Sequence, residues 1–342
     1  MARAPKVQAA ETLPLDWDKL DNAAAPREAD VVMGHAEARE QIAAAFSSSP
    51  PQALLFEGPR GIGKATLAFA LAKTLLAERA VDAELSVDPE AQADRLVAQG
   101  AHRGLLHLQR PYDTKAKPAR FRTAISVEEV RRLVPFLGGT SLDGGWRVVI
   151  VDPVDDLNIN AANAILKLLE EPPRRTLFLL TAHVSGFVMP TIRSRCRSIR
   201  LRPLADEAVA EVLSGQGAEP AFAADAGGAP RQGFVLASAG REVVDTARQL
   251  LQRGRLSDGT QHHVLGDLAA ARKPGQFEVV MDLILDAIAA RAKARPAGGR
   301  FAELYVDTAR QRRTVDEYNL DRKEFVLATC AALAAADANV RG

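Results

Sequence analysis

The stretch "FEGPRGIGKATLA", residues 56–68, joins a short apolar run to a helical pattern through a glycine-rich loop. Gly58, Gly63 and Lys64 fit the spacing G-x-x-x-x-G-K, in which backbone N–H groups close around phosphate oxygens and the lysine reaches the β and γ phosphates. The N-terminus of the helix adds positive potential. The stretch therefore predicts a phosphate loop between a strand and a helix; the alternative is a glycine turn that only packs the helix against a sheet.

Two positions depart from what nucleotide hydrolysis needs. Ala65 stands where a Ser or Thr hydroxyl would bind Mg²⁺, and the helix turns the hydroxyl of Thr66 away from that position. The run "VVIV" ends in Asp152, the expected metal-binding acid, but Pro153 follows where related motors place a water-polarising Glu. We expect weak or absent hydrolysis, while ATP binding without hydrolysis stays open. The residues of this degenerate nucleotide site are Gly58, Gly61, Gly63, Lys64, Ala65, Thr66 and Asp152.

Apolar runs alternate with helical patterns as far as Pro203, and helical patterns alone follow it. "WRVVIVD" and "TLFLLTA" are typical of strands buried on both faces, and "NAANAILKLLEEPP" between them is a helix that two prolines end. This order predicts an α/β fold with a parallel, doubly wound sheet. The expected domains are a poorly ordered segment at 1–28, an α/β domain at 29–203, a small helical domain at 204–244 and an all-helical domain at 245–342.

Composition limits the classes of function. The chain has 342 residues and a formal net charge of +1, so no global field draws it to nucleic acid or membrane. Its two cysteines are too few for a disulfide framework or a four-cysteine zinc site, and we expect no metal. The sequence has no signal-peptide pattern and no apolar run long enough to span a bilayer, so we expect a cytoplasmic protein without membrane contact.

Two basic stretches could carry function. "IRSRCRSIRLR", residues 192–202, is by composition a solvated face, and the alternative is an arginine that stabilises phosphate bound by a neighbouring subunit. "YDTKAKPARFR", residues 112–122, is a basic loop that is either solvated or in contact with DNA phosphates.

"GPRGIGKATLA", "WRVVIVDPVDDLN", "NAANAILKLLEEPP" and "TIRSRCRSIRLRPL", in this order, closely resemble the delta prime family of bacterial DNA polymerase III clamp-loader subunits. The resemblance covers roughly residues 30–205 and implies an AAA+ P-loop domain, a small helical lid and a helical collar. It implies that Arg195 is an arginine finger presented in trans to ATP on a neighbouring motor subunit, and that Arg231 is a weaker candidate for a second sensor arginine.

The resemblance also implies partners and a role. The partners are the gamma or tau motor subunits and delta, and the assembly, a component of DNA-directed DNA polymerase III, loads the sliding clamp on primed DNA. Delta prime is the stator that does not itself hydrolyse ATP, which agrees with Ala65 and Pro153. Many relatives carry a four-cysteine zinc module after the phosphate loop, but residues 78–110 contain no cysteine, so we expect no zinc here.

Two other functions remain open. An autonomous AAA+ ATPase acting on DNA or a protein partner would need Thr66, with Asp155 or Asp156, to replace the lost groups. A small-molecule kinase is a poorer alternative, because the arginine-rich stretch and the long helical C-terminus have no obvious role in it.

Overall fold

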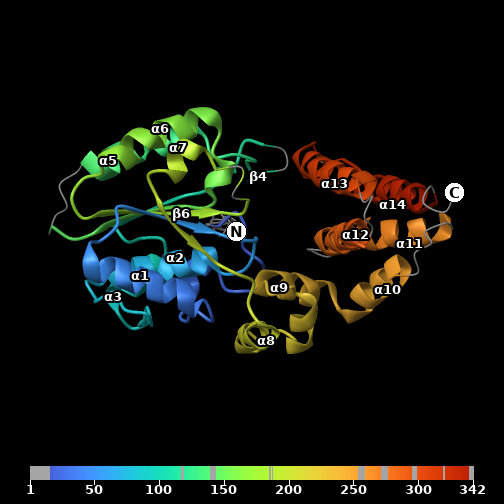
Figure 1. The fold of residues 1–342 in the computed structure, drawn as a ribbon, viewed down its shortest axis with the longest axis horizontal. Coiled ribbons are helices and arrows are strands. Elements are labelled where there is room, and N and C mark those ends of the chain that lie inside the picture. The colour runs from blue at the N-terminus through green and yellow to red at the C-terminus, as the bar shows by residue number, and fades with distance from the viewer. Residues whose placement is uncertain are drawn as a thin grey trace, which may run out of the picture. The chain divides into compact units, whose positions relative to one another are not determined.

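A computed structural model describes residues 16–116, 119–138, 144–184, 186, 188–252, 259–270, 276–294, 299–318 and 320–338. The chain divides into two compact units, Met1–Leu204 and Ala205–Gly342. Each unit is described by itself below, with the elements labelled as in Figure 1.

Among the described residues, the first unit is built on a five-stranded parallel sheet with the order β2-β5-β6-β1-β7. Leu55 of β1 pairs in register with Leu180 of β6, and Val149 of β5 with Phe178. Because both faces of the central strands are covered, their side chains form continuous apolar runs, as the sequence predicts. The strands are β1 (Ala53–Glu57), β2 (Leu105–Leu108), β5 (Arg147–Val151), β6 (Thr176–Ala182) and β7 (Arg197–Arg200).

Helices cover both faces of this sheet (Figure 1). On one face lie α1 (Ala36–Ser48), α2 (Lys64–Leu76) and α3 (Gln92–Ala98). On the other lie α5 (Leu133–Gly138), α6 (Ile159–Glu170) and α7 (Pro190–Arg193), with α4 (Val127–Arg131) packed against α6. Ile165 and Leu169 of α6 belong to one buried cluster with Leu55 and Phe178 of the sheet, and burial of such side chains supplies most of the driving force for this packing.

A short hairpin follows β2 in the chain, in the predicted basic loop. It consists of β3 (Tyr112–Asp113) and β4 (Arg120–Phe121), and the Tyr112 and Phe121 rings meet edge to face at 4.9 Å. Arg122 donates to the Asp113 carboxylate at 3.2 Å, so one of the basic side chains is paired within the hairpin. Lys117 of this loop lies outside the described residues.

The chain is described from Asp16 onward, whereas the sequence analysis expects poor order as far as residue 28. Asp16 and Arg27 form an ion pair of 2.9 Å in which both side chains are more than nine-tenths buried. Pro26–Glu28 forms a 3-10 helix, η1, that packs against α2. Residues 16–28 therefore belong to the folded first unit, and residues 1–15 lie outside the described part.

The second unit consists, where it is described, of helices and one 3-10 segment, η4 (Pro220–Asp225), in line with the predicted helical C-terminal region. An ion pair of 2.5 Å between Arg248 and Asp225 and one of 3.0 Å between Arg291 and Asp337 join helices that are distant in sequence. The predicted division at 244/245 into lid and collar stays a prediction. The helices are α8 (Asp206–Gly215), α9 (Pro230–Ala239), α10 (Arg241–Gln252), α11 (Gly259–Ala270), α12 (Gln276–Lys293), α13 (Gly299–Tyr318) and α14 (Arg322–Ala338).

The predicted fold class is confirmed in its main features: an α/β unit with a parallel five-stranded sheet, followed by a helical region. None of the described helices is both long and apolar enough to cross a membrane. Within the same described part, no three His, Cys, Asp or Glu side chains are grouped so that they could hold a metal ion.

Candidate functional site

The glycine-rich loop lies between β1 and α2, at the carboxyl end of the central strands. Gly58, Gly61 and Gly63 have φ values of +155°, +81° and +105°, which side chains rarely allow. A Cβ atom on Gly58 would lie 2.4 Å from the carbonyl oxygen of Leu201, so this glycine is also required for close packing. The loop between β1 and α2 therefore requires glycine at these positions, while its role in binding phosphate stays a prediction. Ala65 and Thr66 lie in the first turn of α2, without a hydroxyl at position 65.

Lys64 bends back onto its own loop. Its Nζ donates to the carbonyl oxygens of Gly58 at 2.7 Å and Pro59 at 2.6 Å, and the residue is only 3% exposed. Burial lowers the pKa of the Lys64 ammonium to about 8, although Asp152 and Asp155 oppose the shift. The Lys64 ammonium, which the motif would use to bind phosphate, therefore donates to two loop carbonyls instead.

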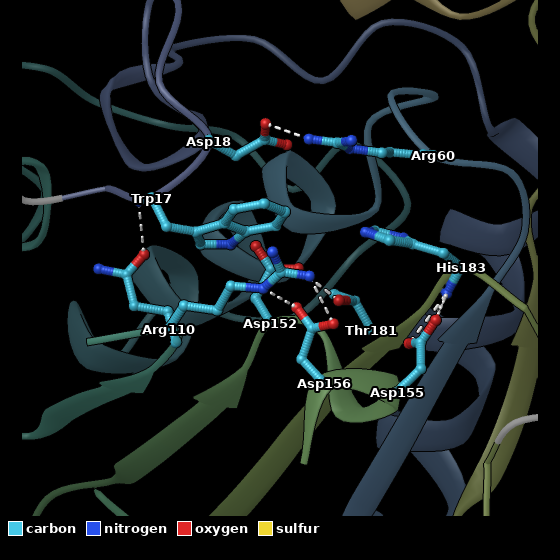
Figure 2. Close-up of polar contacts among 10 residues, drawn as sticks. Trp17, Asp18, Arg60, Arg110, Asp152, Asp155, Asp156, Thr181 and His183 are labelled. Atoms are coloured by element: carbon cyan, nitrogen blue, oxygen red, sulfur yellow. Dashed lines mark hydrogen bonds and ion pairs between the residues drawn. The ribbon is translucent and has the colours of Figure 1, made fainter. Parts of the chain in front are cut away.

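Asp152 follows β5 at the edge of the sheet where the sequence places it. Its carboxylate accepts a hydrogen bond from the hydroxyl of Thr181, near the end of the neighbouring strand β6 (Figure 2). Burial raises the pKa of Asp152 to about 6, while the Thr181 hydrogen bond and Lys64 lower it in part. The acid and the lysine of the motif thus lie close enough for their charges to interact.

The two acids offered as substitutes for the missing Glu are both held by the protein. Asp155 accepts hydrogen bonds from the backbone N–H of His183, at 3.1 and 3.0 Å, and from that of Val184 at 3.2 Å. Asp156 forms a two-point ion pair with Arg110, at 2.5 and 2.7 Å. Both carboxylates therefore already have partners within the protein, which does not favour either of them as a substitute for the missing Glu.

Residues that the sequence analysis did not select complete this edge of the sheet (Figure 2). The guanidinium groups of Arg60 and Arg110 lie 5.1 and 4.2 Å from the centre of the Trp17 ring, and Asp18 forms an ion pair of 2.6 Å with Arg60. Arg60 lies inside the quoted glycine loop, which is a sequence signal for it. Trp17 and Asp18 carry no such signal, because only the folded chain brings them here.

His35, just before α1, also contacts the loop. In the tautomer that carries a proton on Nε2, this nitrogen donates to the carbonyl of Ile62 at 2.7 Å. Burial is the main cause that lowers the pKa of His35. The ring therefore holds the loop next to Gly63 as a neutral group at physiological pH.

Arg195 lies outside the phosphate loop, between α7 and β7, and 34% of its side chain is exposed. One nitrogen forms an ion pair with Glu170 at the end of α6, and another donates to the carbonyl of Thr191 at 2.9 Å. Arg193, two residues earlier, instead pairs with Glu57, which is 3% exposed at the end of β1. Arg193 and Arg195 thus differ in their partners rather than in exposure: their side chains are 39% and 34% exposed, and only Arg193 pairs with a buried acid.

The other arginines of this stretch are exposed, and the cysteine within it is partly buried. Arg197, Arg200 and Arg202 are exposed, in line with an edge strand that buries only Ile199. Burial raises the pKa of the Cys196 thiol to about 12, so it is no nucleophile at neutral pH.

Arg231 lies near the start of α9 in the second unit. Its guanidinium is 3.8 Å from the Glu278 carboxylate of α12. The predicted role of Arg231 as a second sensor arginine stays a prediction, and the contact described here is one between two helices of the same unit.

Comparisons with known proteins agree with the motifs. The chain matches the family described as "DNA polymerase III, delta subunit" over residues 35–205. The DNA polymerase III subunit delta' of Pseudomonas aeruginosa is 40% identical over 144 residues, which cover 42% of this chain and 41% of that protein. The delta' subunit of Bacillus subtilis is 30% identical over 173 residues, covering 50% of this chain and 48% of that protein.

The tau subunit of Escherichia coli DNA polymerase III is 32% identical over 163 residues, 47% of this chain and 23% of that protein. Among solved structures, a DNA polymerase III gamma subunit-related protein from Thermotoga maritima aligns with 16% identity and a TM-score of 0.45, covering 87% of this chain and 99% of that one.

The delta' relatives are matched over 39% to 48% of their own length, so this chain spans less than half of each of these proteins. The family match covers residues 35–205, which include the phosphate loop, Asp152 and Arg195, and it ends just after the arginine-rich stretch. The motifs, the fold of the first unit and these matches lead to one conclusion: the chain belongs to the delta prime family of DNA polymerase III subunits.

Proposed function

We propose that this protein is a clamp-loader subunit that acts as a stator: it assembles with gamma or tau motor subunits and delta, and helps load the sliding clamp on primed DNA. The observation that carries the proposal is the state of Arg195. About one-third of its side chain is exposed while Glu170 and Thr191 hold its position, which suits a group that enters a neighbour's ATP site. Family membership supports the assembly, since relatives of this chain include gamma and tau subunits.

The phosphate loop supports the passive half of the proposal. A catalytic site needs a hydroxyl for Mg²⁺ and an acid free to orient water. This chain has Ala65 at the first position, and Asp155 and Asp156 are bound to backbone amides and to Arg110. We therefore propose that the chain does not hydrolyse ATP, that any ATP it holds is bound without turnover, and that no zinc takes part.

The test is ATP turnover by the reconstituted complex of this chain with gamma or tau and delta, in the presence of clamp and primed DNA. Arg195→Ala should lower turnover about 10³-fold at the site that this chain completes, which is the order reported for arginine fingers. Total turnover then falls by that site's share, while assembly, measured by size-exclusion chromatography, stays intact. Arg197→Ala is the matched control, because it removes an exposed arginine two residues away. Equal turnover in both variant complexes would refute the finger.

The alternative, an autonomous AAA+ ATPase, is tested separately on the purified chain. Magnesium-dependent hydrolysis that Lys64→Ala abolishes would establish that alternative and overturn the passive role. Absence of turnover, with and without primed DNA, is the result we expect.

A further inference from the structure

Two residues that precede the first helix lie over the phosphate loop. We call Trp17 and Asp18 the N-terminal strap. The backbone N–H of Trp17 donates to the Gln109 side chain at 3.1 Å, which fixes the strap to the segment after β2. Figure 2 shows the indole between Arg110 and the loop, above the edge where Asp152 and Thr181 meet.

The strap contacts two guanidinium groups, those of Arg60 and Arg110. Arg60 is part of the phosphate loop, and its guanidinium binds the Asp18 carboxylate at 2.6 Å while lying 5.1 Å from the Trp17 ring centre. Arg110 lies 4.2 Å from the same ring centre on the other side. The cation–π contacts of Trp17 and the ion pair of Asp18 both stabilise the strap in this place.

The carboxylate of Asp18, whose side chain is 27% exposed, also acts electrostatically on the buried groups of the site. Its charge is among those that shift the pKa values of Lys64, Asp152 and His183, so it lies within electrostatic range of all three. The Asp18 carboxylate binds Arg60 of the loop and acts on the charge of Lys64. A phosphate group that bound the loop would therefore compete with this carboxylate for the same cations. Lys64 meanwhile donates to two loop carbonyls.

We propose that the N-terminal strap is a built-in competitor for the phosphate loop: Trp17 and Asp18 close it in cis, and a polyphosphate binds only by displacing them. The ligand class is a nucleoside triphosphate or an inorganic polyphosphate, recognised through Arg60 and Lys64. The proposal concerns the chain's own loop and does not depend on Arg195 acting in trans, so each can fail without the other.

The first measurement is the affinity of the full-length chain for inorganic tripolyphosphate and for ATP, by calorimetry without magnesium. Asp18→Asn keeps the shape of the side chain and removes the carboxylate that competes for Arg60. We expect tighter tripolyphosphate binding by about three- to fivefold, the range of a partly exposed ion pair. The double variant with Trp17→Leu, which also removes both cation–π contacts, should bind about tenfold more tightly or better than the native chain.

Asp21→Asn is the matched control, because Asp21 is an exposed acid of the same segment and the change in net charge is identical. An equal gain in Asp18→Asn and Asp21→Asn would overturn the proposal, since it would reflect net charge alone. Absence of binding in all variants would overturn it too, because an uncovered loop should accept the ligand. A gain for ATP without one for tripolyphosphate would place the competition at the base rather than at the phosphates, and would also contradict it.

The second measurement detects displacement directly. The sequence has two tryptophans, and Trp146→Phe leaves Trp17 as the only one. Acrylamide should quench Trp17 fluorescence more strongly when tripolyphosphate is bound, because the ring leaves its place between the guanidinium groups. Saturating tripolyphosphate that leaves the quenching constant unchanged would mean that phosphate binds beneath an unmoved strap, and the proposal would be wrong.

Discussion

Replacing Gly58 by alanine separates the two roles of the glycine loop, packing and phosphate binding. A Cβ atom at position 58 would lie 2.4 Å from the carbonyl oxygen of Leu201 and 2.8 Å from Cδ1 of Ile62. The isoleucine can move, but the carbonyl cannot move cheaply, because the N–H of Leu201 donates to Glu57 of β1 at 2.8 Å. The clash must therefore separate β7 from the end of β1 or shift the loop.

The size of the effect follows from two contributions. Overpacking in a rigid environment costs about 1–3 kcal/mol, and a φ of +155° costs an alanine about 1–3 kcal/mol more. We expect Gly58→Ala to lower the free energy of unfolding by about 2–6 kcal/mol. Gly63→Ala is the matched control, since its Cβ would meet nothing closer than His35 at 3.6 Å and only the backbone contribution of about 1–2 kcal/mol remains.

The assay is urea unfolding followed by tryptophan fluorescence, without nucleotide. Trp17 and Trp146 both lie in the first unit, so the signal reports that unit alone. If the two variants lose the same stability, the close approach to Leu201 does not determine the need for glycine, and the packing argument fails. A larger loss in Gly58→Ala would mean that the first glycine of the motif is required for packing even when no phosphate is bound.

Three further predictions concern other contacts of the first unit. Burial lowers the pKa of His107 to about 3 against an ordinary value of 6.5, so the unfolded chain binds more protons below pH 6.5 and stability falls as the pH drops. His107→Phe should remove about 2 kcal/mol of the stability difference between pH 7 and pH 5, measured by urea unfolding at each pH. Asp94 is 1% exposed and pairs with Arg79 at 2.8 Å, so Asp94→Ala should cost about 3 kcal/mol, whereas a loss under 1 kcal/mol would contradict a structural ion pair. Glu170→Ala should change the stability of the isolated chain by less than about 1 kcal/mol. It should nevertheless lower ATP turnover by the assembled complex, though by less than Arg195→Ala does, because Arg195 loses the carboxylate that holds it. Unchanged turnover would contradict this role of Glu170.

The strands that the sequence predicts well are those whose burial is complete. Val148–Val151 and Thr176–Ala182 are buried throughout, and a continuous apolar run is what such burial requires. β2 was not assigned because it has four residues, one of them His107. β7 is an edge strand that buries Ile199 alone, so its arginines alternate with little apolar signal.

The candidate site was predictable only where its residues belong to a local pattern. Lys64 and Asp152 each lie next to a strand, and the carboxyl ends of parallel strands meet at one edge of the sheet. Trp17 and Arg110 belong to no motif, and their contact depends on the path of the chain before α1. The direction of the Lys64 side chain was also beyond prediction, since a lysine that meets phosphate and one that meets its own loop occupy the same sequence position.

The structure gives a reason why a phosphate-loop signature can persist without hydrolysis. Gly58 is needed by Leu201, Lys64 ties the loop together through its carbonyls, and Asp152 accepts from Thr181. Each of these groups is satisfied within the chain, so none of them needs a nucleotide to justify its burial. In a motor subunit, position 65 supplies the hydroxyl that binds Mg²⁺. This chain has Ala65 at that position, so the loop departs from the motif at a residue that serves catalysis rather than folding. If Gly58→Ala destabilises the unliganded chain by the expected amount, the glycine motif is required for the folding of the domain. The residue to test for a role in ATP hydrolysis is then Arg195.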